Sequence, residues 1–230
     1  MVVVFEKKGG ICMSIRTRYE KELAEVFDNL VLMCRHIETA IEKCVKALID
    51  RDFELAAEVS ADHKLIDKME REIEQSCLRI LLMEHPVARD FHEVSAALKM
   101  ITDLERIGDQ AWDIAEIVTQ FGDDEYIKKL EHIPQMALIV IQMVKDGVHA
   151  YINHDLALAL SLDKTDDKVD NLFNTVMADL SALIKENPNN AEQAIMLMMI
   201  TKYLERIGDH AVNIGDWVVY AITSNRPDNE

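Results

Sequence analysis

Glycine and proline are scarce in this chain, with 7 and 4 residues among 230, and aromatic residues make up only 6%. Sandwiches and barrels need frequent turns and many aromatic or β-branched residues, so the composition disfavours them. Leucine, isoleucine, alanine, methionine, glutamate and lysine are abundant, and these residues favour helices. The composition therefore predicts an all-α protein.

Cysteines and long hydrophobic runs are also few. No Cys-x-x-Cys pair occurs, which argues against a disulfide framework, and we interpret the four cysteines as reduced thiols: Cys12, Cys34, Cys44 and Cys77. The largely apolar stretch from Met136 to Val144, which Gln142 interrupts, is about half the roughly 20 residues that a membrane span requires. The opening Met-Val-Val-Val-Phe is too short for a signal peptide. We therefore expect a cytoplasmic protein.

Positively charged residues are few: the chain has 25 lysines and arginines against 42 aspartates and glutamates, which gives a formal net charge of -17. A negative field repels nucleic-acid backbones and anionic lipid headgroups. It also disfavours free phosphate or nucleotide ligands unless a cation lies between anion and carboxylates. We expect neither nucleic acid nor direct membrane insertion.

Six amphipathic stretches follow one another along the chain, joined by short connections that make neighbouring helices antiparallel. The predicted helices cover residues 15–50, 52–84, 87–121, 124–153, 154–187 and 190–223. Residues 1–12 lack a helical period, and we interpret them as a disordered leader or as the product of a start codon upstream of Met13. Residues 225–230 form a C-terminal tail.

The hexapeptide Leu-Glu-Arg-Ile-Gly-Asp occurs twice, at 104–109 and at 204–209. The duplication extends to the preceding helices. There, Asp-Lys-Met-Glu at 67–70 resembles Asp-Lys-Val-Asp at 167–170, one hundred residues later. We predict two tandem, pseudo-symmetric three-helix bundles, 13–121 and 124–224. Gly108 and Gly208 interrupt good helices, which indicates close packing against a neighbouring helix.

The third helix of each half has an apolar seam at 3-4-3-4 spacing, which we predict to be core: Leu104, Ile107, Ala111, Ile114 and Val118, then Leu204, Ile207, Ala211, Ile214 and Val218. Roughly opposite each seam lies an acidic stripe: Glu105, Asp109, Asp113 and Glu116, then Glu205, Asp209, Asn213 and Asp216. The second helices carry matching stripes: His63, Asp67, Glu70 and Glu74, then Asp163, Asp167, Asp170 and Asn174.

If the second and third helices are antiparallel, the stripes of each half face each other. In the first half this places Asp67 level with Glu105 and His63 level with Asp109. In the second half it places Asp167 with Asp209 and Asp163 with Asn213. Such stripes can be solvated faces, but like charges stacked along a helix cost a few tenths of a kcal/mol per pair unless a cation neutralises them. We therefore predict metal sites for one or more ions, suited to Mg, Mn, Fe or Ca, with zinc also open.

The repeated hexapeptide, continued by Gln-Ala-Trp-Asp-Ile-Ala-Glu in the first copy and His-Ala-Val-Asn-Ile-Gly-Asp in the second, resembles the twin signature of the PhoU family. The His-Pro-Val-Ala-Arg-Asp segment at 85–90 also resembles that family, and the similarity covers about residues 13–224. The resemblance implies multinuclear iron or zinc clusters on Glu105, Asp109, Asp113, Glu205, Asp209 and Asp216. His63, where the second half has Asp163, departs from the family pattern.

The resemblance also implies a regulator that restrains phosphate uptake and the phosphate-starvation response. Its partners would be the phosphate ABC transporter with its ATPase subunit and a phosphate-sensing histidine kinase, and homodimers are common in the family. A di-metal carboxylate enzyme, such as a phosphatase or oxidase, is an alternative. Buried, core-facing Glu-x-x-His pairs would favour the enzyme, and this sequence lacks them. A metal-free helical scaffold is a third hypothesis.

Overall fold

The computed structural model describes residues 6–86, 89–121 and 125–227, with side chains from residue 16 onward. Within these residues the six long helices are α1 (Glu6–Asp50), α2 (Phe53–Met83), α3 (Arg89–Val118), α4 (His132–Asn153), α5 (Leu156–Glu186) and α6 (Ala191–Thr223), with a 3-10 turn at Pro188–Asn190. The all-α prediction is confirmed. None of the described helices combines the length and hydropathy that a membrane span needs.

The turns that start α2 and α5 repeat one local design. Arg51 and His154 have positive φ angles of 59° and 53°, which reverses the chain sharply after the preceding helix. The next residue is an N-cap aspartate in both halves: Asp52 accepts a hydrogen bond from Leu55 N, and Asp155 accepts one from Leu158 N. Such caps satisfy backbone donors that the first helical turn leaves unpaired.

Two predicted helix starts are wrong. Helix α4 begins at His132 rather than residue 124, because residues 125–131 bind other helices instead: Tyr126 donates to the carbonyl of Leu48, and Ile127 N donates to Gln193 at 2.6 Å. Helix α1 begins at Glu6, so residues 6–12 are helical and not a disordered leader. Residues 1–5, and 228–230 of the expected tail, lie outside the described part of the chain.

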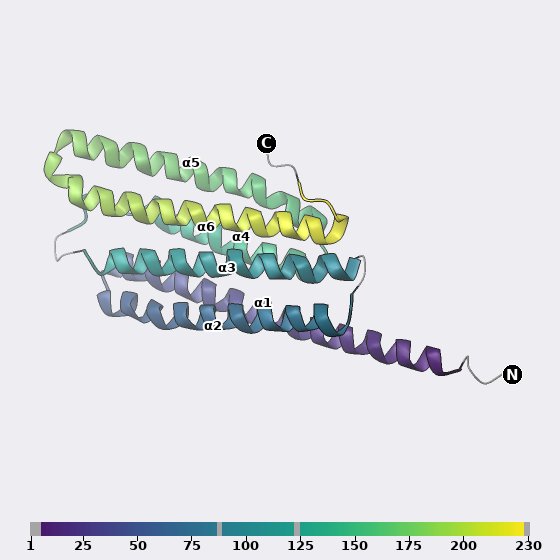
Figure 1. Cartoon of the computed structure of the whole chain (residues 1–230). Helices are drawn as coiled ribbons and strands as arrows, with labels where there is room; N and C mark the ends of the chain where they lie inside the picture. The colour runs from purple at the N-terminus through teal and green to yellow at the C-terminus, as the bar shows by residue number, and fades with distance from the viewer. Residues whose placement is uncertain (1–5, 87–88, 122–124, 228–230) are drawn as a thin grey trace.

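Helices α1–α3 pack together as one three-helix bundle and α4–α6 as a second. The bundles meet along α3 and α6, and again along α1 and α4. Figure 1 shows α2, α3, α6 and α5 side by side, with α1 and α4 behind them. The lines along which the second and third helices of each half meet therefore lie on the same broad face, and we call these two helix–helix seams the α2–α3 and α5–α6 grooves.

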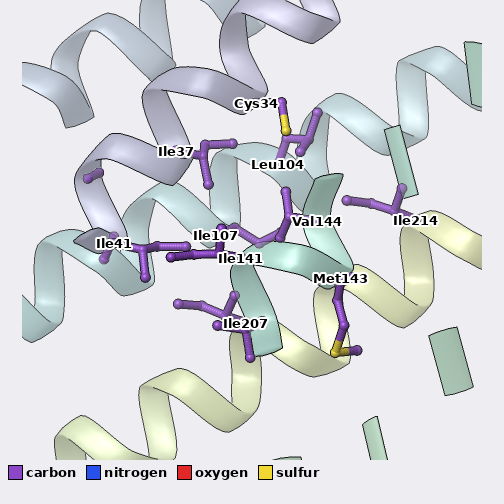
Figure 2. Close-up of a cluster of buried hydrophobic side chains, with 14 of the residues drawn as sticks. Cys34, Ile37, Ile41, Leu104, Ile107, Ile141, Met143, Val144, Ile207 and Ile214 are labelled. Atoms are coloured by element: carbon purple, nitrogen blue, oxygen red, sulfur yellow. The ribbon is translucent and has the colours of Figure 1, made fainter. Parts of the chain in front are cut away.

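One hydrophobic core runs through both bundles. Both predicted seams are fully buried, and Figure 2 shows Leu104 and Ile107 of α3 gathered with Ile207 and Ile214 of α6 around side chains from α1 and α4. Three cysteines are free and buried, as predicted: Cys34, Cys44 and Cys77. The shared core fixes α3 against α6, so the acidic stripes of the two helices are held in a constant relation.

Candidate metal centre

The groove between α2 and α3 brings together the first acidic stripe pair. His63 of α2 donates from Nε2 to Asp109 Oδ1 of α3 at 2.9 Å, and the same nitrogen lies 3.7 Å from Asp67 Oδ1. One potential ligand atom from each of these three residues lies within 4.8 Å of the others. The predicted pairing of His63 with Asp109 is confirmed. Together with Glu70, Glu105 and Asp113, we call these residues the first cluster.

Carboxylates crowd one another in the first cluster. Burial raises the pKa of Glu105, and the negative charge of Asp109 raises it further, with a smaller contribution from Asp67. Burial and the negative charge of Asp109 likewise raise the pKa of Asp113. Glu116, an exposed member of the predicted stripe, raises the same pKa further. The acids that we predicted to stack do act on one another, and they would gain from a neutralising cation.

Arginine side chains supply part of the missing positive charge. Arg106 lies 3.1 Å from Asp109 Oδ2 and 3.6 Å from Glu105, and Arg71 lies 3.9 Å from Asp67. Both arginines are well exposed, so solvent screens these pairs and each contributes little. The carboxylates can therefore exchange an arginine for a metal ion at small cost.

Trp112 is a feature of the first cluster that we did not predict. Its ring stacks on His63 with centroids 6.0 Å apart and an interplanar angle of 21°. The stacking helps to fix the imidazole plane, so that Nε2 remains directed towards Asp109. The signal was present in the sequence, because Trp112 lies three residues after Asp109, on the same side of α3.

The second groove, between α5 and α6, is centred on a residue that we missed. Asp166 lies against Gly208, where an added Cβ would be 2.4 Å from Asp166 Oδ1. Burial raises the pKa of Asp166 to about 7, and further contributions come from predicted acids: Asp170, Asp209, Glu205 and Asp163. These five acids are the second cluster. Burial and Glu205 also raise the pKa of Asp209, and Lys202 pairs with Glu205.

Three second-half residues are not placed as we expected. Asp167 is exposed and lies one residue further round α5 than Asp166. Asn213 does not pair with Asp163 but lies 3.4 Å from Asp103 of α3. Asp216 is only 9% exposed rather than on an open stripe, because the segment after α6 folds back and brings Arg226 to 4.0 Å from its carboxylate and over the ring of Trp217.

Asp103 joins the two halves next to the second cluster. Its carboxylate accepts hydrogen bonds from His210 at 3.0 Å and from Trp217 at 3.2 Å, in addition to Asn213. These donors all belong to α6, so a first-half carboxylate orients the face of α6 that carries Asp209. Charge-assisted bonds of this kind are stronger than neutral ones, and they fix the two grooves relative to each other.

The residues of both grooves fit a bound cation. The first cluster offers one imidazole and several carboxylates, a donor set that suits borderline and hard metal ions. In the second cluster, Asp166 Oδ1 is enclosed and has no hydrogen-bond partner among the described residues. A buried carboxylate oxygen without a partner is costly, and a metal ion would satisfy it.

Comparison with known proteins adds a family to this geometry. Residues 30–118 and 133–218 match the PhoU domain. A phosphate-specific transport system accessory protein PhoU homolog from Clostridium acetobutylicum is 32% identical, over 93% of this chain and 98% of its own length. The homolog from Pseudomonas aeruginosa is also 32% identical, over 94% and 89% of the two chains.

Solved structures agree with the sequence comparisons. The crystal structure of PhoU from Pseudomonas aeruginosa has a TM-score of 0.85 and covers 90% of this chain and all of its own. The phosphate transport system regulatory protein PhoU from Streptococcus pneumoniae has a TM-score of 0.84 at 25% identity, and covers 92% of this chain and all of its own. The similarity therefore extends over both halves.

Proposed function

Because this chain belongs to the PhoU family, we propose that it is an accessory protein of phosphate-specific transport that restrains phosphate uptake and the phosphate-starvation response when phosphate is plentiful. The support is the full-length similarity to relatives named for this transport system. The repeated hexapeptides lie on α3 and α6, at the centre of the shared fold.

The proposed partners are the phosphate ABC transporter with its ATPase subunit and a phosphate-sensing histidine kinase, met in the cytoplasm by a homodimer of this chain. The strongly acidic composition supports protein partners over nucleic acid. The broad face formed by α2, α3, α6 and α5 is rigidly held by the common core, so it can serve as a docking surface. We propose a binding role and no catalytic one.

Metal binding is the second part of the proposal, and the arrangement of His63, Asp67 and Asp109 carries it. Three potential ligand atoms of different residues within 4.8 Å form most of a coordination shell, and Glu105 and Asp113 lie beside them. Iron or zinc clusters fit the mixed nitrogen and oxygen donors, with manganese, magnesium and calcium as alternatives. A bound ion would neutralise the crowded carboxylates and stiffen the α2–α3 groove.

Deletion of the gene in a bacterium that carries it tests the regulatory role. In phosphate-rich medium we expect the deletion strain to take up phosphate rapidly and to express a phosphate-starvation reporter that the parent strain keeps off. Reintroducing the wild-type chain should restore repression. Normal repression in the deletion strain would rule the role out, whatever metal the protein binds.

A further inference from the structure

The end of the first half where α2 leads into α3 carries an exposed group of large apolar side chains. Leu78, Leu82 and Met83 of α2 are 43%, 71% and 60% exposed, and Phe91, in the first turn of α3, is 47% exposed. Leu78 and Leu82 are four residues apart and therefore lie on one side of α2. Exposed apolar side chains that gather in one place mark a contact surface, whereas single ones need no explanation. We call these four residues the apolar tip.

The repeat shows that the fold does not require these side chains. Three of them correspond, one hundred residues later, to alanines: Leu78 to Ala178, Leu82 to Ala182 and Phe91 to Ala191. Only Met83 has a large counterpart, Leu183, which is less exposed. The α5–α6 connection lies at the opposite end of the molecule from the α2–α3 connection (Figure 1). Small side chains suffice there, so the large ones of the apolar tip have another role.

The charges at the apolar tip also differ from those of the second half. Arg79 is exposed and forms no ion pair within the described part of the chain, and its counterpart is Asp179, which pairs with Lys128. Arg89, exposed at the start of α3, corresponds to Asn189. The duplicated ends therefore differ in charge as well as in apolar area.

Arginines of α1 match the acids beside the apolar tip. Arg18 lies 3.0 Å from Glu84, whose side chain is buried, and Arg16 lies 2.9 Å from Asp90. The charges that face solvent at this end are therefore mainly those of arginines, although the whole chain is strongly acidic.

The first cluster is far enough away to leave this local charge effective. Its nearest member, Glu70, precedes Leu78 by eight residues, which is about 12 Å along a helix, and the screening length at physiological salt is about 8 Å. Glu74, one turn before Leu78, is the exposed acid of α2 that lies closer. A negatively charged surface that approaches end-on thus meets arginines before it meets the acidic broad face.

These observations favour a lipid surface over a protein. Leu, Met and Phe side chains at the end of a helix pair can enter the interface of a bilayer without a complementary pocket, and arginines beside them attract anionic headgroups. A second copy of this chain is disfavoured, because tip-to-tip packing would bring Arg79 and Arg89 towards their own copies.

We propose that the apolar tip adsorbs to membranes that contain anionic phospholipids, with Leu82, Met83 and Phe91 in the headgroup region and Arg79 and Arg89 at lipid phosphates. The chain does not span the membrane. The acidic broad face repels the bilayer, so adsorption orients the molecule with the α2–α3 end towards the lipid. This inference goes beyond the proposed function and depends on neither metal binding nor transcriptional repression.

Co-sedimentation of the full-length protein with vesicles tests the proposal. We expect binding to equimolar phosphatidylglycerol and phosphatidylcholine, and weaker binding to phosphatidylcholine alone. Leu78→Ala/Leu82→Ala, which installs the residues of the second half, should lower the partition coefficient by at least about tenfold, because the apolar area that enters the interface is lost. Arg79→Gln should lower it by about fivefold on anionic vesicles, the effect of one arginine near such a surface.

The matched control is Leu138→Ala/Leu160→Ala, which removes two leucines that are 69% and 56% exposed on α4 and α5. This variant should bind vesicles as the wild-type protein does. Unfolding curves identify any variant that loses its fold, and Arg79→Gln keeps the test decisive if the double variant at the tip does not fold.

Four results would overturn the proposal. They are no binding of the wild-type protein to anionic vesicles, equal binding to neutral ones, equal losses in both leucine variants, and a dimer in light scattering that Leu78→Ala/Leu82→Ala dissociates. The last result would assign the tip to a second copy of the chain. The deletion experiment and the metal measurements keep their meaning in every case.

Discussion

Replacing His63 by alanine should lower the affinity of the first cluster for Zn²⁺ by at least about a hundredfold, since loss of groups that only support a ligand already costs 10–100-fold. His63 supplies the nitrogen that lies 2.9 Å from Asp109 and 3.7 Å from Asp67. Without it, the site keeps carboxylates alone, which bind zinc less selectively. Competition against a chromogenic zinc chelator measures the change.

The control is His149→Ala, which removes an imidazole from an exposed position on α4, away from the α2–α3 groove. This variant should bind zinc as the wild-type protein does. Equal affinities of wild type and His63→Ala would show that zinc binds elsewhere, and a loss in both variants would point to non-specific surface binding.

Asp166→Asn should raise the free energy of unfolding of the metal-free protein, relative to wild type, by more at pH 8 than at pH 5. Burial raises the pKa of Asp166 in the folded state to about 7, above its ordinary value of about 3.9. Between these values the folded state keeps a proton that the unfolded state releases, so the free energy of unfolding falls as pH rises through this window. Asparagine carries no charge, and this part of the pH dependence disappears.

A fully shielded carboxyl with this shift would contribute about 4 kcal/mol. Because Asp166 is only partly buried, solvent screening lowers the expected difference to about 1–2 kcal/mol between pH 5 and pH 8. Urea unfolding in the presence of a chelator measures it, beside Asp167→Asn, whose exposed side chain should give no such change. Parallel pH profiles for wild type and Asp166→Asn would contradict the assignment.

The bounds of a helix were predictable from the sequence where residues within that helix, or its own N-cap residue, determine them. The periodic seams fixed α2, α3, α5 and α6 to within a few residues, and Asp52 and Asp155 mark two starts. The beginning of α4 could not be predicted in this way, because Tyr126 and Ile127 make bonds to α1 and α6. Those partners are distant in sequence. The helix faces along which the two bundles meet could not be predicted either, because they too depend on contacts between residues distant in sequence.

The first cluster was predictable because a short connection through Pro86 sets how α2 and α3 align, which places His63 opposite Asp109. In the second half the same reasoning misplaced Asp167 and Asn213. Asp166 was missed because an acid on the apolar side of a helix is a break in the pattern rather than part of a stripe. Comparison with Ile66, its counterpart in the repeat, would have drawn attention to it.

The most direct test of the first cluster as a metal centre is a crystal structure of this chain grown with Zn²⁺, with anomalous scattering data collected at the zinc edge. We expect an anomalous peak about 2.0–2.2 Å from His63 Nε2 and from carboxylate oxygens of Asp67 and Asp109. Zinc peaks only at other positions, with His63 still donating its hydrogen bond to Asp109, would contradict the account.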